Sequence, residues 1–175
     1  MRASNSINSI TLLLNIAMFM VFGTITITAQ DKIEVAGKIT ATVIEKCNFD
    51  VGDKEGHIFH ISKSEGFNTS MGKNGFMDGA LVINNNFSDL VKGNGIHRGY
   101  IIFSKEGNST VAQWEGKVTT VISDDTPYTT FEGTFNYING TGEFQNIQGG
   151  GKYAGKYISA NSYVVEWEGE YFIKE

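Results

Sequence analysis

The sequence predicts an all-β protein built as an eight-stranded, antiparallel, closed barrel. Apolar and polar residues alternate in several segments, helical spacing is almost absent after residue 30, and glycines recur on the apolar faces. A period of two is typical of strands with one buried face. A β-sandwich is the alternative, because two stacked sheets would bury the same apolar faces.

The segment 112–122 alternates most clearly. Its even-numbered residues, among them Ala112, Trp114 and Val118, are predicted to face the core, while Gln113 and Glu115 face water. The same pattern predicts strands at 33–43, 130–137 and 163–171. Weaker patterns predict four more, at about 57–62, 76–83, 96–103 and 152–159, which gives eight strands.

Turn-forming residues separate these segments. They are Gly66, Asn74-Gly75, Gly93-Asn94-Gly95, Gly107-Asn108, Asp124-Asp125 and Asn139-Gly140. Gly149-Gly150-Gly151 is also expected to be a turn; no helix follows it, so it does not fit a phosphate-binding loop. The closed barrel is favoured over the sandwich because glycines on a core face let strands bend at barrel corners. The glycines expected on that face are Gly37, Gly116, Gly133 and Gly169.

Residues 1–29 have the layout of a secretory signal peptide. Arg2 precedes an apolar run from Ile10 to Gly23, and the small residue Ala29 precedes the first acidic residue, Asp31. An uncleaved membrane anchor is the alternative, since 10–29 is long enough to span a bilayer. We expect cleavage after Ala29, a secreted or periplasmic location, and a single domain over 30–175.

The remaining chain is acidic and has one cysteine. Residues 1–29 hold one basic and no acidic residue, so their removal changes the net charge from −5 to −6. An acidic domain argues against a nucleic-acid partner. Cys47 is expected to be a small buried residue. No cofactor and no metal is expected, because His57 and His60 should point to opposite strand faces and His97 has no neighbouring ligand in the sequence.

The aromatic residues of the predicted core face are the best candidates for a binding site. An eight-stranded barrel is wide enough either to be filled by side chains or to hold one small ligand. The candidate ligand-binding residues are His57, Trp114, Phe131, Phe135, Tyr137, Tyr163 and Trp167. His57 is included because it shares the more apolar parity with Phe59 and Ile61, which predicts an inward side chain at the mouth of the barrel.

Two motifs resemble a known family. Asn139-Gly140-Thr141-Gly142-Glu143-Phe144, followed by Ile147-Gln148-Gly149, is similar to a glycine-rich stretch of the allene oxide cyclase-like barrels. Gly52-Asp53-Lys54-Glu55-Gly56-His57 resembles the Gly-Asp-x-x-Gly-His opening of exported bacterial members. The resemblance implies the eight-stranded, calycin-type barrel that these proteins share with dirigent proteins, and it suggests a homotrimer. The catalytic carboxylate and asparagines of the cyclases have no matching positions here.

The sequence supports three hypotheses about function. The leading hypothesis is an exported barrel that binds a small, largely apolar molecule in its interior. The second is an isomerase or cyclase, which the resemblance permits and which would need an inward-facing acid or base. The third is a structural module with a filled core. A cavity would separate the third hypothesis from the other two.

Overall fold

The computed structural model describes residues 31–124 and 126–175. The segment predicted to be a signal peptide lies outside these residues. The strands are β1 (Ile33–Asp50), β2 (His57–Ser70), β3 (Leu81–Val91), β4 (Asn94–Lys105), β5 (Asn108–Ser123), β6 (Thr126–Thr141), β7 (Ile147–Tyr157) and β8 (Ser162–Ile173). The short 3-10 helix η1 (Gly142–Phe144) joins β6 to β7. Within the described residues, no helix is long and apolar enough to span a lipid bilayer.

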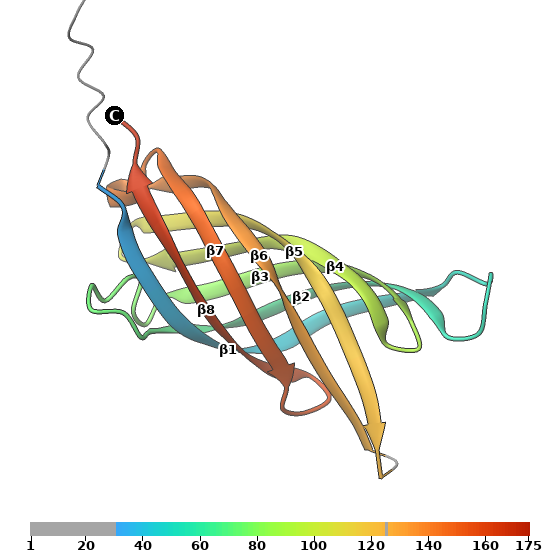
Figure 1. The fold of residues 1–175 in the computed structure, drawn as a ribbon. Coiled ribbons are helices and arrows are strands. Elements are labelled where there is room, and N and C mark those ends of the chain that lie inside the picture. Colours follow the sequence, from blue (N-terminus) through green and yellow to red (C-terminus); the bar gives the residue numbers. More distant parts are fainter. Residues whose placement is uncertain (1–30, 125) are drawn as a thin grey trace, which may run out of the picture.

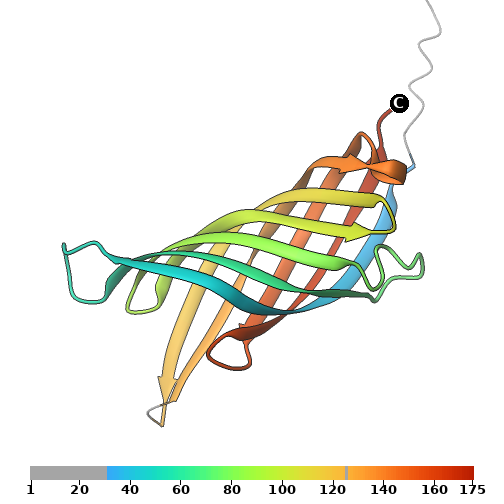
Figure 2. The same cartoon turned by 180° about the vertical axis from the view of Figure 1, so that it is seen from behind.

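The eight strands form one closed, antiparallel ring. Each strand pairs with its neighbour in the sequence, and β8 returns to pair with β1. Figures 1 and 2 show this ring from opposite sides. Closure removes the free sheet edges that would otherwise invite pairing with other chains. The predicted barrel is therefore confirmed, and the alternative sandwich is not adopted.

Two predicted boundaries are wrong in the region of β2 and β3. Residues 76–80 were expected to begin a strand, but they belong to a loop, and β3 begins at Leu81. Gly66 was expected in a turn, but it lies inside β2, opposite Ala41 of β1. A Cβ at Gly66 would lie 2.6 Å from the Ala41 Cα, so glycine permits a close strand approach there.

Two predicted turns are strands. Gly149, Gly150 and Gly151 belong to β7 and pair with Tyr171, Glu170 and Gly169 of β8. Asn139 and Gly140 lie within β6, where Gly140 pairs with Thr110. The turn between β3 and β4 lies close to the predicted Gly93-Asn94-Gly95. It is a two-residue hairpin connection made by Lys92 and Gly93, which both have positive φ.

Aromatic rings on the inner face of the barrel lie over glycines of the neighbouring strand. Four such pairs occur, each between residues directly opposite in the register: Trp167 with Gly37, Trp114 with Gly99, Phe131 with Gly155, and Tyr153 with Gly133. A Cβ at any of these glycines would lie within 2.4–2.7 Å of the facing side chain. The missing side chain is thus what makes room for each ring, and the ring covers the backbone that glycine leaves bare.

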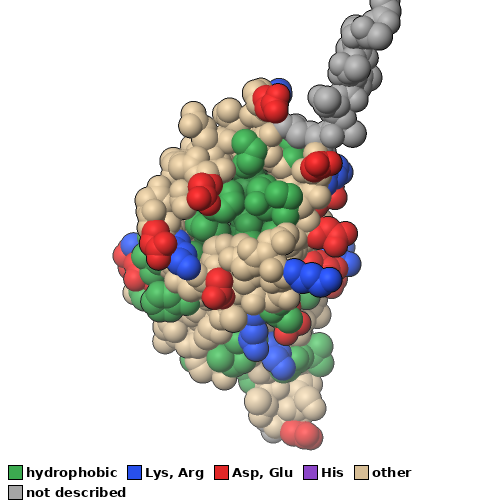
Figure 3. Space-filling view, turned by 90° about the vertical axis from the view of Figure 1, so that its left-hand side faces the viewer, with side chains coloured by type: hydrophobic (Ala, Val, Ile, Leu, Met, Phe, Trp, Pro, Cys, Tyr) green, Lys and Arg blue, Asp and Glu red, His purple; other side chains and the backbone are tan. Residues whose placement is uncertain are grey.

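A loop between β2 and β3, residues 71–80, closes one end of the barrel. Its Phe76 is buried and packs against Trp167 and Tyr171, with ring centroids 5.8 and 5.2 Å apart. Asn68, which is also buried, donates from Nδ2 to the carbonyl oxygens of Phe76 and Met77 and accepts from Trp167 Nε1. Figure 3 faces the side of the molecule on which this loop lies, and hydrophobic side chains gather there among charged ones. These contacts hold the loop in place as the floor of the barrel interior.

We predict that Gly37→Ala lowers the free energy of unfolding by about 1–3 kcal/mol, the usual range for overpacking a core. The added methyl group would meet the Trp167 ring at 2.6 Å and Asn68 Oδ1 at 2.7 Å, and neither neighbour is free to move away. Urea unfolding measures the change. Lys38→Ala, on the exposed face of the same strand, is the control and should change stability little. Equal stability of Gly37→Ala and the unmodified protein would contradict this account of the packing.

Candidate functional site

The interior of the barrel holds a cavity of about 410 Å³. All eight strands contribute to its walls, and Gly56, Gly93, Ala160 and Asn161 line it at the end away from the 71–80 loop. The cavity therefore opens between the β1–β2, β3–β4 and β7–β8 connections and is closed at the opposite end. Its volume falls in the ~300–1,000 Å³ range that is usual for small-molecule sites.

One side of the cavity is an aromatic wall. The side chains that form it are six of those proposed from the sequence: Trp114, Phe131, Phe135, Tyr137, Tyr163 and Trp167. Their rings pack mainly edge to face, as in the pairs of Phe131 with Tyr163 and of Phe135 with Trp167. Such contacts hold the rings in fixed orientations. The wall is a rigid apolar surface that faces open space.

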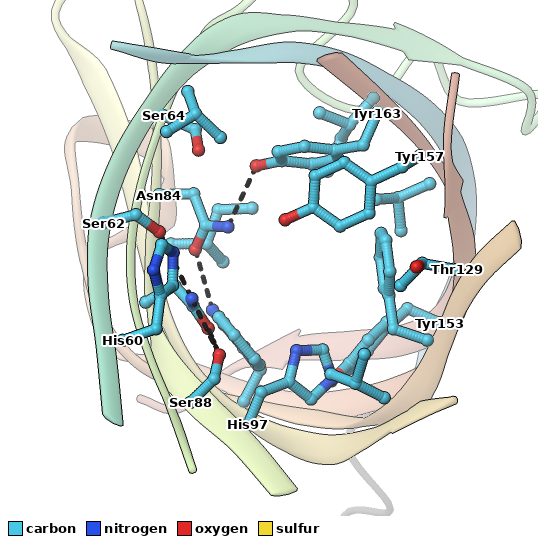
Figure 4. A pocket seen from close by; sticks show the side chains of 18 of the residues that line it. His60, Ser62, Ser64, Asn84, Ser88, His97, Thr129, Tyr153, Tyr157 and Tyr163 are labelled. Carbon is cyan, nitrogen blue, oxygen red and sulfur yellow. Dashed lines mark hydrogen bonds between the residues drawn. The ribbon is translucent and has the colours of Figure 1, made fainter. Parts of the chain in front are cut away.

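The opposite side is a polar strip on β2 and β3. It consists of Ser62 and Ser64 on β2 and Asn84, Asn86 and Ser88 on β3. Figure 4 shows Ser62, Ser64, Asn84 and Ser88 on this side. Asn86 Nδ2 donates to the hydroxyl oxygens of Ser62 and Ser88, at 3.2 and 3.0 Å. These five residues were not predicted from the sequence to form part of a site. The sequence does contain a signal for this strip, because small polar residues occupy alternate positions along both strands, and these positions face inward.

Asn84 ties the polar strip to the aromatic wall. Its Oδ1 accepts from Trp114 Nε1 at 3.0 Å, and its Nδ2 donates to the Tyr163 hydroxyl at 3.0 Å. The buried N–H of tryptophan and O–H of tyrosine need such partners. One asparagine therefore satisfies two polar atoms of the wall and fixes the two sides relative to each other.

His97 lies on the cavity wall next to the aromatic side chains. Its ring is 4.8 Å from that of Trp114, and its Nε2 accepts from the Tyr153 hydroxyl at 3.0 Å. Burial lowers the pKa of His97 to about 4, opposed by a hydrogen bond to the backbone of Glu132. Burial also raises the pKa of Tyr153. At neutral pH both groups are uncharged and bonded to each other, so the pair is a structural part of the wall.

Three kinds of titratable side chain line the cavity among the described residues. Within the described residues, no aspartate or glutamate lines the cavity. In the same part of the chain, no three His, Cys, Asp or Glu side chains come together as a metal site would require. Cys47 was expected to be buried, but it is exposed. The remaining titratable side chains on the walls are lysine, histidine and tyrosine.

The predicted orientation of His57 is wrong. Its side chain does not line the cavity but lies between two carboxylates, with Nδ1 bonded to Asp53 and Nε2 2.6 Å from an Asp89 oxygen. Phe59 and Ile61, which share its parity, are 38% and 43% exposed. Phe59 and Ile61 face outward because the inward positions of this part of β2 are the even-numbered ones, occupied by Ile58, His60, Ser62 and Ser64. His57 fastens the β1–β2 connection to β3 at the mouth.

Comparisons with known proteins give structural neighbours only. No protein-family model matches the chain, and no curated protein matches it. Among solved structures, the pterocarpan synthase dirigent protein PsPTS1 is 12% identical with a TM-score of 0.41, over 85% of this chain and 97% of that one. The pterocarpan synthase dirigent protein GePTS1 is 11% identical with a TM-score of 0.44, over 87% and 98%. The barrel itself is established by the strand pairing of this chain.

We predict that His57→Gln makes the protein less stable at about pH 6 than at about pH 9, relative to the unmodified chain. Asp89 and Asp53 raise the pKa of His57 above its usual value of 6.5. A histidine whose pKa is higher in the folded state stabilises the fold. This stabilisation is fully present below the pKa of the unfolded state and is lost as the pH rises through the pKa of the folded state. Melting temperatures of both proteins across this range measure the effect.

The difference in melting temperature between the two proteins reports on His57 alone, because His97 affects the stability of both proteins equally. The lowered pKa of His97 acts in the opposite direction, removing stability as the pH falls from 6.5 towards about 4. A difference in melting temperature that stays constant from about pH 6 to about pH 9 would show that the carboxylates do not hold a protonated His57.

Proposed function

We propose that this protein is an exported barrel that binds a small, largely apolar molecule in its interior. The observation that supports the proposal most is the composition of the cavity: an aromatic wall and a strip of small polar side chains are joined at Asn84 and enclose open space. Sites for small molecules are typically apolar with a few fixed polar groups that set orientation. A ligand with a flat apolar body and a polar edge would match both sides.

The cavity also weighs against the other two functions. A structural module with a filled core would place side chains in the space that is open here. An isomerase or cyclase would need an acid or base directed at the ligand. No carboxylate of the described residues lines the cavity, and His97 is bonded to Tyr153, which leaves His60 as the wall histidine that could act as a base. The cavity supports binding directly, whereas catalysis would also require His60 to act on the ligand as a base.

Export rests on the sequence of residues 1–29. The charge-free segment between Arg2 and Asp31 matches a signal peptide in its order of basic, apolar and small residues. Export would place the barrel outside the cytoplasm.

We predict that Val118→Phe weakens binding of an apolar probe about 5- to 150-fold, since overfilling the site costs ~1–3 kcal/mol. Val118 lines the cavity from β5. The probe is an acetyl(dimethylamino)naphthalene, and isothermal titration calorimetry measures its affinity. Thr119→Phe is the matched control, because the neighbouring side chain points outward and is exposed. No binding to the unmodified protein, or equal binding to both variants, would contradict a ligand site in the barrel.

We predict that the exported protein begins at or near Gln30. Removal of residues 1–29 follows from the layout of the signal segment. N-terminal sequencing of protein collected outside the cytoplasm tests this. A membrane-bound product that retains Met1 would instead support the uncleaved anchor.

A further inference from the structure

Most polar groups on the cavity walls already have protein partners. Asn84 is bonded to Trp114 and Tyr163, Asn86 to Ser62 and Ser88, and His97 to Tyr153. Thr120 and Thr129 share a hydrogen bond of 2.9 Å. A polar atom that is satisfied by the protein gains little from a ligand. The cavity atoms without a partner therefore indicate where a ligand would be recognised.

His60 offers one such atom. Its side chain lines the cavity from β2, and its Nδ1 is 2.5 Å from Asn48 Oδ1. An amide oxygen only accepts, so Nδ1 carries the proton and Nε2 carries a lone pair. Burial and the nearby Lys46 lower the pKa of His60, which keeps the ring neutral. No hydrogen bond within the described residues involves Nε2, and this nitrogen is a free acceptor.

The hydroxyl of Tyr157 is a second such group. Its ring packs against Phe131 and Tyr163, with centroids 5.8 and 5.7 Å apart, which fixes its direction. Figure 4 shows its hydroxyl pointing into the centre of the barrel, on the side opposite His60. Burial raises the pKa of Tyr157, so the hydroxyl keeps its proton. It makes no hydrogen bond to the part of the chain that the structure describes.

Charge is nearly absent from the same walls. Lys46 is the one lining residue with a permanent charge among those described. It is exposed at the mouth, where its ammonium donates to Asn161 Oδ1 at 3.1 Å. A charged group deeper in the barrel would lose its hydration without gaining a counter-ion. The interior therefore suits a molecule without charge.

We infer that His60 Nε2 and the Tyr157 hydroxyl anchor the ligand from opposite walls, and that the ligand is an uncharged ring compound. It carries a hydrogen-bond donor that meets His60 and an acceptor that meets Tyr157. The aromatic wall covers the body between these two groups. This inference rests on the proposed function and adds to it two specificity-determining residues and a ligand class.

Four naphthalene probes test the inference by calorimetry. Acetyl(methylamino)naphthalene has both the donor and the acceptor. Acetyl(dimethylamino)naphthalene lacks the donor, ethyl(methylamino)naphthalene lacks the acceptor, and the carboxylate counterpart of the first carries a charge. We expect the first probe to bind the unmodified protein about 3- to 10-fold more tightly than the second or the third, the effect of one hydrogen bond. The charged probe should bind more weakly than the first.

Three variants test which residue produces each of the two probe preferences. His60→Phe should remove the preference for the methylamino group and keep the preference for the acetyl group. Tyr157→Phe, which deletes only a hydroxyl, should do the reverse. Tyr153→Phe is the matched control: its hydroxyl is bonded to His97, so both preferences should remain even though the melting temperature falls. Circular dichroism establishes that each variant is folded before it is titrated.

The outcomes separate this inference from the function on which it rests. Binding of all four probes with equal affinity, or preferences that survive in both His60→Phe and Tyr157→Phe, would overturn the inference and leave a ligand site in the barrel. Tighter binding of the charged probe would also overturn it. Failure of every probe to bind the unmodified protein would overturn the proposed function itself.

Discussion

The pairing of interior aromatic rings with glycines of the adjacent strand is the constraint on which the rest of the structure depends. Trp114, Phe131, Tyr153 and Trp167 each lie over a glycine directly opposite in the register. The rings can therefore lie against the barrel wall instead of crossing its centre. Small side chains on β2 and β3 complete the interior. The open space is a consequence of large side chains on one wall and small ones on the other.

The two ends of the barrel follow from the same packing. Trp167 donates to Asn68, Asn68 holds the carbonyl groups of the 71–80 loop, and Phe76 of that loop packs back onto Trp167. One tryptophan thus links the aromatic wall to the floor of the cavity. At the other end, His57 ties the β1–β2 connection to Asp89 of β3 without covering the opening. The closed end is filled by packed side chains, while at the open end His57 links the surrounding β1–β2 connection to β3.

Much of the fold could be predicted from alternation, but the cavity could not. The rule that apolar side chains face inward is valid for β5, β6 and β8, where Trp114, Phe131 and Trp167 point as expected. In β2 the rule fails, because Ser62 and Ser64 face the cavity while Phe59 and Ile61 are exposed. His57 was placed by that rule and was misplaced with it. A strand that faces a cavity is not packed against a core, so the polarity of its inner face can be the reverse of that of a core strand. The Phe76 loop was missed for a related reason, since a buried loop that is held by a side-chain amide leaves no periodic signal.

The most direct test of a ligand site inside the barrel is a crystal structure of the protein with a bromine-labelled acetylnaphthalene, in which anomalous scattering locates the bromine atom. We expect a bromine peak inside the barrel, between the Phe131 ring and the polar strip that includes Ser88. A peak on the outer face of the sheet, or an interior filled by side chains with the probe at saturation, would contradict the proposed site.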